Sequence, residues 1–174
     1  MTKHTEPDFG RSDVIETSST TLRSLLILGL SLAPAAAMAD LGDATTIASG
    51  LANPRGIAFA PNGALYVAEG GSGGPGPCIP SPVPANGPRC YGETGAITRI
   101  LPDGSVKRVL TGLPSLALGD GTVEGGVSDI AFFGAAGFVT IGWGGNPADR
   151  ASVGGKSALF GTLLQMAPSG KYKV

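Results

Sequence analysis

The chain has 174 residues, of which 42% are hydrophobic and 14% charged, and its formal net charge is −1 at pH 7. This balance is that of an ordinary globular protein without the excess positive charge that nucleic-acid binding requires, so we expect no nucleic-acid partner. The 29 glycines and 14 prolines indicate frequent turns between short elements, a composition that favours strands over helices.

The chain begins with a segment typical of an export signal. An uncharged stretch follows Arg23, contains an apolar run at residues 25–30 and ends in the small-residue triplet 37–39. This pattern predicts a signal peptide and leader over residues 1–39, cleavage before Asp40, and a secreted or periplasmic protein. Because the apolar run is shorter than the roughly 20 residues of a spanning helix, we expect no stable membrane anchor after cleavage. A retained membrane anchor is the alternative. Acidic residues precede Arg23 where a signal peptide has positive charge, a departure that a misassigned start codon would explain.

The rest of the chain contains an internal repeat. The matching segments are 55–59 with 128–132, 64–68 with 137–141, and 95–107 with 161–173. The first copy predicts four short strands, at residues 56–59, 64–68, 96–101 and 105–110. Four antiparallel strands form one blade of a β-propeller, and repetition of this unit along the chain is typical of that fold. We therefore expect an all-β fold with about two blades of a partial propeller in residues 40–174, and a β-sandwich of the same strands as the alternative.

The predicted connections are short at one end of each unit and long at the other. The short corners are residues 61–63, 102–104, 134–136 and 168–170, of which three have the Pro-x-Gly pattern of a hairpin turn. The long connections are residues 69–94, 112–127 and 143–160. In an up-and-down unit the long connections share one face, and loops on a rigid scaffold carry most binding sites. We therefore expect an unknown small molecule or protein to bind this long-loop face.

One long connection contains both cysteines of the chain, Cys78 and Cys90. In an oxidising compartment, two cysteines this close in sequence predict a disulfide. A two-thiol metal site is the alternative, but it requires histidine or further cysteine, and the only histidine is His4 in the predicted leader. We interpret the neighbouring glycine run at residues 70–76 as a flexible loop, because it lacks the Gly-Lys-Ser/Thr ending of a phosphate-binding loop.

Several segments of the chain resemble those of one protein family. They are residues 50–59 (Gly-Leu-Ala-Asn-Pro-Arg-Gly-Ile-Ala-Phe), the stretch around Cys78 and Cys90, and residues 159–164 (Leu-Phe-Gly-Thr-Leu-Leu). In these segments the chain is similar to the ScyD/ScyE family, exported proteins named for their place beside scytonemin-pigment biosynthesis genes. The resemblance covers nearly all residues after Asp40 and implies the first blades of a six-bladed, NHL/TolB-like propeller outside the cytoplasm. Family members are longer, so it also implies a fragment or a truncated gene product.

Five side chains are candidates for ligand binding on the long-loop face: Arg55, Glu69, Asp129, Trp143 and Arg150. Arg55 and Asp129 precede equivalent strands of the two units, and the other three lie in the predicted long connections. For the four charged residues, the alternative is a salt bridge or a turn cap. For Trp143, the alternative to stacking on a ring-shaped ligand is packing against a neighbouring blade.

The candidate residues lack the chemistry of a catalytic site. No histidine remains after residue 39 to act as a general base, so we predict no catalytic residue and a binding or assembly module. The alternative is a propeller enzyme, either a lactonase-like hydrolase or a quinone-dependent sugar dehydrogenase, with its catalytic residues in missing blades. We expect no cofactor and no metal site. A bound calcium ion is the alternative, although the carboxylates are dispersed along the sequence and calcium needs about six to eight oxygen ligands.

The ends of the folded part give a further expectation. Residues 45–48 are expected to form an outer strand ahead of the first blade, and the last predicted strand reaches Val174. Uncovered blade faces and open strand edges promote pairing between copies. We therefore expect residues 40–174 alone to be oligomeric or aggregated, and to become monomeric when further blades are supplied.

Overall fold

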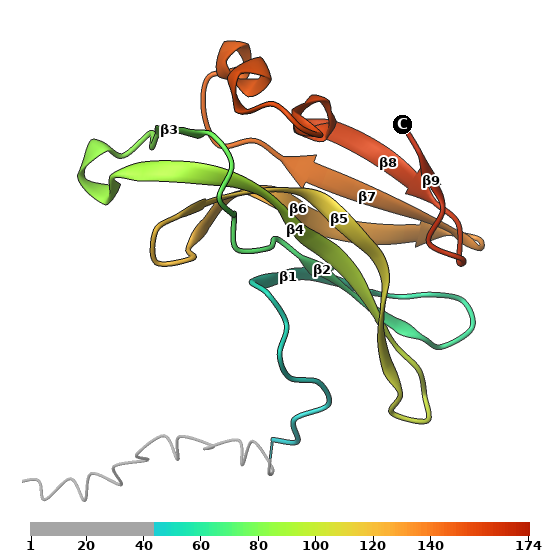
Figure 1. Ribbon diagram of the computed structural model, residues 1–174. Helices are drawn as coiled ribbons and strands as arrows, with labels where there is room; N and C mark the ends of the chain where they lie inside the picture. The colour runs from blue at the N-terminus through green and yellow to red at the C-terminus, as the bar shows by residue number, and fades with distance from the viewer. Residues whose placement is uncertain (1–43) are drawn as a thin grey trace, which may run out of the picture. The chain divides into compact units, whose positions relative to one another are not determined.

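A computed structural model describes residues 44–174, and the predicted leader and its cleavage site before Asp40 lie outside the described residues. Within this range the chain is all-β, as predicted: nine strands form one antiparallel sheet, accompanied by three short 3-10 helices (Figure 1). No helix of residues 44–174 is long and apolar enough to cross a membrane.

The strands follow one another along the chain as two up-and-down meanders. They are β1 (Pro54–Phe59), β2 (Leu65–Glu69), β3 (Cys78–Pro80), β4 (Pro88–Ile100), β5 (Val106–Leu118), β6 (Val123–Phe133), β7 (Ala136–Gly142), β8 (Thr162–Met166) and β9 (Tyr172–Lys173). The first meander is β1-β2-β4-β5, and the second is β6-β7-β8-β9. The end of β5 pairs with the start of β6 and joins them. The 3-10 helices are η1 (Pro84–Asn86), η2 (Pro147–Val153) and η3 (Ser157–Leu159).

Four hairpin turns share one geometry. They span residues 60–64, 101–105, 118–122 and 167–171, and in each the first residue donates a backbone hydrogen bond of 2.8–2.9 Å to the fifth. The fourth residue is always glycine, with φ between 80° and 86°, a left-handed conformation that glycine adopts without steric cost. The Pro-x-Gly pattern predicts three of these turns. The turn at 118–122 escapes the pattern because Gly119 replaces proline.

Much of the predicted long-loop face consists of strands. β4 and β5 continue past their predicted ends, and residues 88–95 pair with residues 113–118 to form a hairpin extension, here called the arm. β3 pairs with the other edge of β4 in this region. The prediction of a long loop at residues 112–127 is therefore wrong. The glycines and prolines of this region lower its strand propensity, and only pairing with strands on both sides compensates for that.

The glycine run at residues 70–76 packs against the arm. Gly71 and Gly73 are buried, and a Cβ atom added at Gly92 would lie 2.1 Å from the carbonyl oxygen of Gly73. The amide of Gly73 also donates a hydrogen bond of 3.0 Å to Ser115 Oγ. The interpretation of this run as a flexible loop is wrong, because its glycines allow two backbones to approach closely.

Apolar side chains between the two meanders form the main core. Tyr66 of β2 packs against Phe132 of β6, with the ring centroids 4.8 Å apart. The buried residues around this pair include Ile97, Leu110, Leu113, Leu116, Val127, Ile130, Val139, Ile141, Leu164 and Met166. Each meander is a single layer, so this contact supplies the interior that neither has alone.

A smaller apolar cluster lies on the opposite face of the first meander. Leu65, Val67 and Ile100 form it, and Ala48 and Leu51 pack against it from the preceding segment. Residues 45–48 form no strand, so the prediction of an outer strand there is wrong. Side-chain packing, without a strand ladder, places this segment on the sheet.

The strand registers show which residues of the two meanders are equivalent. Ile57 pairs with Val67, and Ile130, its counterpart in the repeat, pairs with Val139. Val139 is therefore the equivalent of Val67, whereas the sequence alignment matches it with Tyr66. The alignment is wrong by one residue because the β6–β7 turn is one residue shorter than the β1–β2 turn. In a strand, a shift of one residue moves a side chain to the other face.

The two meanders contact each other through faces that are not equivalent. Ile57 and Val67 point away from the second meander, and Ile57 is 62% exposed. Their equivalents Ile130 and Val139 point toward the first meander and are 3% and 0% exposed. In this contact the second meander therefore uses the face whose equivalent in the first meander points away from it.

Gly92 tests the close approach between the glycine run and the arm. We expect Gly92→Ala to lower the free energy of unfolding by about 1–3 kcal/mol, because its Cβ meets the backbone of Gly73. Gly119→Ala is the matched control, since a Cβ at Gly119 meets nothing within 4 Å. Urea denaturation measures both variants. Equal stability of the two variants would contradict the packed arrangement.

Candidate functional site

The long segments of the chain come together on one side. Figure 1 shows the β1–β2, β6–β7 and β8–β9 turns on one side, and β3, η2 and the β5–β6 turn on the other. Phe160 is fully buried, and its ring meets that of Tyr91 in the arm edge-on, with centroids 6.3 Å apart. The backbone amide of Lys156 donates a hydrogen bond of 2.7 Å to Tyr91 Oη. The segment 143–160 thus covers the arm, and together they form the long-loop face.

A buried arginine of the arm connects several segments of this face. Arg89 of the arm is 2% exposed, and its Nη1 donates to the carbonyl of Gly144 and lies 3.5 Å from Glu124 Oε2. Its guanidinium lies 5.3 Å from the centre of the Trp143 ring, within the range of a cation–π contact. Burial lowers the pKa of Arg89, while the charges of Glu124 and Asp149 act in the opposite direction. Sequence reasoning missed Arg89, because a lone arginine beside a cysteine carries no pattern.

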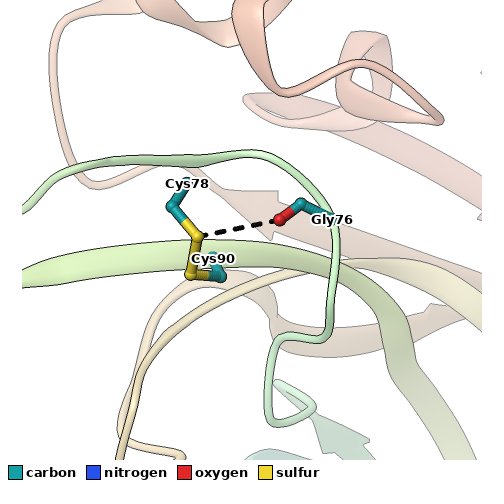
Figure 2. The surroundings of a disulfide bond; sticks show 3 residues. All are labelled: Gly76, Cys78 and Cys90. Atoms are coloured by element: carbon teal, nitrogen blue, oxygen red, sulfur yellow. Dashed lines mark hydrogen bonds between the residues drawn. A yellow bond between two sulfur atoms is a disulfide. The ribbon is translucent and has the colours of Figure 1, made fainter.

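The disulfide connects this arginine to the loop before it. Cys78 and Cys90 lie directly opposite each other on β3 and β4 and form the predicted bond, with a Cα–Cα distance of 4.0 Å (Figure 2). The loop that the bond closes provides Ser81, whose Oγ donates a hydrogen bond of 2.9 Å to Glu124 Oε1. The disulfide therefore holds a donor to the carboxylate that pairs with Arg89.

The structure places Trp143 and Arg150 within the covering segment. Trp143 is half-buried and packs against Phe160, with ring centroids 5.0 Å apart. Its indole N–H donates a hydrogen bond of 2.9 Å to the carbonyl of Asn146. Arg150 donates to the carbonyl of Phe160. Both side chains thus order the segment 143–160, and their use in ligand binding stays a prediction.

Arg55 and Asp129 are exposed and lie on β1 and β6, the first strands of the two meanders. Arg55 Nη2 donates a hydrogen bond of 2.8 Å to the carbonyl of Val123. Asp129 Oδ1 accepts one of 2.8 Å from the amide of Ile130. The two strands approach closely here, since a Cβ added at Gly56 would lie 1.9 Å from Asp129 Oδ1. Their ligand-binding role also stays a prediction.

Glu69 lies at the end of β2, and not in a long connection as the sequence predicts. Its side chain is fully buried and accepts hydrogen bonds from Thr98 Oγ1, from Arg108 Nε at 3.0 Å and Nη2 at 2.7 Å, and from the amide of Ala52 at 2.6 Å. Arg108 also donates to the carbonyl of Gly50 at 2.9 Å. Glu69 and Arg108 therefore fasten the segment before β1 to the first meander.

The pKa of Glu69 reflects this environment. Burial raises it, but the hydrogen bonds from Arg108, Thr98 and Ala52 outweigh the burial, and the pKa is lowered from its ordinary value of 4.5. The carboxylate is therefore held in its charged form by donors of the chain itself. This fits the salt-bridge alternative for Glu69.

Two shallow hollows flank the disulfide loop on the long-loop face. One, of about 340 Å³, is lined by Cys78, Ile79, Pro80, Ser81, Pro84, Gly87 and Pro88. The other, of about 430 Å³, is lined by Asn86, Pro88, Cys90, Leu118, Gly119 and Asp120. A hollow of about 460 Å³ lies instead at the β8–β9 turn, lined by residues such as Met166, Pro168 and Tyr172. The hollows beside the disulfide are the ones that the long-loop face provides.

Comparison with family models, with curated proteins and with solved structures found no match to this chain. Among residues 44–174, no group of three or more histidine, cysteine, aspartate or glutamate side chains is placed to hold a metal ion. The described part of the long-loop face thus offers buried polar pairs, aromatic packing and two open hollows.

The disulfide is open to a direct stability test. Because it closes a loop with a sequence separation of 12, we expect Cys78→Ser/Cys90→Ser to lower the free energy of unfolding by about 3 kcal/mol in the chain-entropy model. Urea denaturation measures the change, and mass spectrometry of the unmodified protein should find no free thiol. An unchanged unfolding midpoint would show that other contacts hold the loop.

Glu69 predicts a pH dependence of stability. Since its folded pKa lies below its ordinary value of 4.5, its contribution is present above that value and is lost as the pH falls through the folded pKa. We expect Glu69→Gln to cost about 2 kcal/mol at neutral pH, the range of a hydrogen-bonded charge with a partly exposed partner. The cost should shrink in acid. Glu93→Gln, at an exposed pair with Lys156, is the control and should change stability less.

Proposed function

We propose that this chain is an exported β-propeller protein similar to the ScyD/ScyE family, in which the two meanders are successive blades. The observation that carries this is the contact between non-equivalent faces. In a propeller every blade uses one face toward the preceding blade and the other toward the following blade. Ile130 and Val139 pack backwards onto the first meander, while Ile57 and Val67 occupy the same positions on its far side.

The same observation argues against a β-sandwich. Two repeated sheets that form a closed sandwich share one interior, and both leave a solvent-facing side with polar residues. Here the outer face of the first meander carries Ile57 and Phe59, which are 62% and 71% exposed. The second meander likewise exposes Leu163 by 55%. Apolar outer faces on both sides favour the propeller, whose blades are covered on two sides.

The role that we propose is binding or assembly through the long-loop face. Several charged residues of that face have partners within the chain: Arg89 lies beside Glu124, Arg150 donates to a backbone carbonyl, and Lys156 pairs with Glu93. Such contacts hold the surface in one conformation, and we propose that the shape of this surface recognises the partner. The two hollows beside the Cys78–Cys90 bond are the proposed contact region. The disulfide is also compatible with the proposed export.

Photo-crosslinking in a secreting host tests the role of this face. A photoreactive phenylalanine analogue placed at Val83 or Asp149, exposed on the long-loop face, should capture a partner. The same analogue at Asn62 or Ser169, exposed in hairpin turns on the opposite side, is the matched control. We expect adducts from the first two positions and none from the controls, detected as mass shifts of the purified protein. Adducts from all four positions, or from the controls alone, would contradict the proposed face.

A further inference from the structure

Residues 44–174 expose two sheet faces that carry apolar side chains. The head face is the outward side of the first meander, where Ile57, Phe59 and Val106 are 62%, 71% and 46% exposed. The tail face is the outward side of the second meander, formed by Ala131, Phe138, Thr140, Leu163 and Gln165. Leu163 is 55% exposed. Apolar faces of this kind mark sites of association.

The registers relate the tail face to a face that is already covered inside the chain. Phe138 pairs with Ala131 as Tyr66 pairs with Ala58, so Phe138 is the equivalent of Tyr66. In the same way Thr140 pairs with Leu163 as Ala68 pairs with Ile97. Tyr66, Ala68 and Ile97 belong to the main core and are buried by the second meander. The tail face is thus the repeat of a surface that another sheet covers.

The registers also relate the head face to the sheet that does the covering. Phe59 pairs with Leu65 as Phe132 pairs with Gly137, so Phe59 is the equivalent of Phe132. Inside the chain, Phe132 packs on Tyr66 with ring centroids 4.8 Å apart. The head face therefore carries, in the same positions, the residues that fit a tail face.

We propose that copies of this chain associate head to tail, the head face of one copy packing on the tail face of the next as the two meanders pack within the chain. This rests on the proposed propeller arrangement of the meanders, and no ligand enters it. Phe59 of one copy then meets Phe138 of the next, as Phe132 meets Tyr66. The contact is continuous with the internal one, because the tail face is the opposite side of the sheet that already covers the first meander.

The segment before β1 determines where on the head face this contact lies. Ala48 and Leu51 cover Leu65, Val67 and Ile100, so the open part of the head face is at β1, around Ile57 and Phe59. When copies associate through two different surfaces, the first copy keeps a free head face and the last copy keeps a free tail face, unless the copies close into a ring. Head-to-tail association therefore gives species larger than a dimer.

Complementary blocking variants of the full chain test the direction of the contact. Phe59→Glu blocks only the head face, and Leu163→Glu blocks only the tail face. Because each interface needs one intact head face and one intact tail face, each variant by itself should be a monomer, while the wild type forms larger species. An equimolar mixture should give a dimer of twice the monomer mass, through the intact tail of the first variant and the intact head of the second. Light scattering coupled to size exclusion measures all four samples.

Val83→Glu is the matched control, since Val83 is 52% exposed on the disulfide loop, and it should associate like the wild type. A monomeric wild type, a variant that keeps the wild-type size, or a mixture that stays monomeric overturns the proposal. Photo-crosslinking from the long-loop face is independent of these outcomes and distinguishes them from a failure of the proposed function.

Cysteine crosslinking checks the same contact without a buried charge. Phe59→Cys mixed with Phe138→Cys should give disulfide-linked dimers under mild oxidation. Val83→Cys mixed with Phe138→Cys should give none. Equal dimer yields from the two mixtures would contradict the head-to-tail contact.

Discussion

The burial of apolar side chains between two single-layered meanders is the interaction on which the rest of the structure depends. A four-stranded antiparallel sheet has no interior of its own, so Tyr66, Phe132 and their neighbours leave water only where the sheets meet. The alternation of side chains along each strand then determines what stays outside. Because both meanders have apolar residues on both faces, covering one face of each leaves Phe59 and Leu163 exposed.

Buried charge pairs hold the remaining segments against this core. Glu69 and Arg108 fasten residues 50–52 to the first meander, and Arg89 and Glu124 connect the arm to β6. Such pairs lose hydration on burial, so they add little net stability compared with apolar contacts. Their hydrogen bonds nevertheless specify one position for each loop. The long-loop face is therefore an ordered surface in which many polar groups are used within the chain, although Arg89 Nε and Glu124 Oε2 are buried without a hydrogen-bond partner.

The disulfide acts in the same way on the most irregular segment. The stretch between the end of β3 and the start of β4 contains only the short helix η1, and its contact with Glu124 depends on Ser81 and Asn86. Covalent closure reduces the conformations open to this loop before folding. Because this loop is held at both ends, it keeps the carboxylate of Glu124 beside Arg89. The strands of the arm would not impose that arrangement by themselves.

The sequence by itself determined the all-β class, the repeat, three of the four turns of one geometry, and the cysteine pair. These depend on local chemistry, because Pro-x-Gly sets backbone angles within a few residues and the repeat is visible residue by residue. Only the tertiary structure decided the arm, the packed glycine run, and the equivalence of Val67 with Val139. The arm has low local strand propensity and forms because partners lie on both sides. The equivalence depends on the β6–β7 turn, which is one residue shorter than the β1–β2 turn. Sequence similarity does not detect this difference, although a shift of one residue moves every side chain of a strand to the opposite face. The sequence also could not identify the partners of Glu69 and Arg89, because these partners come from distant parts of the chain.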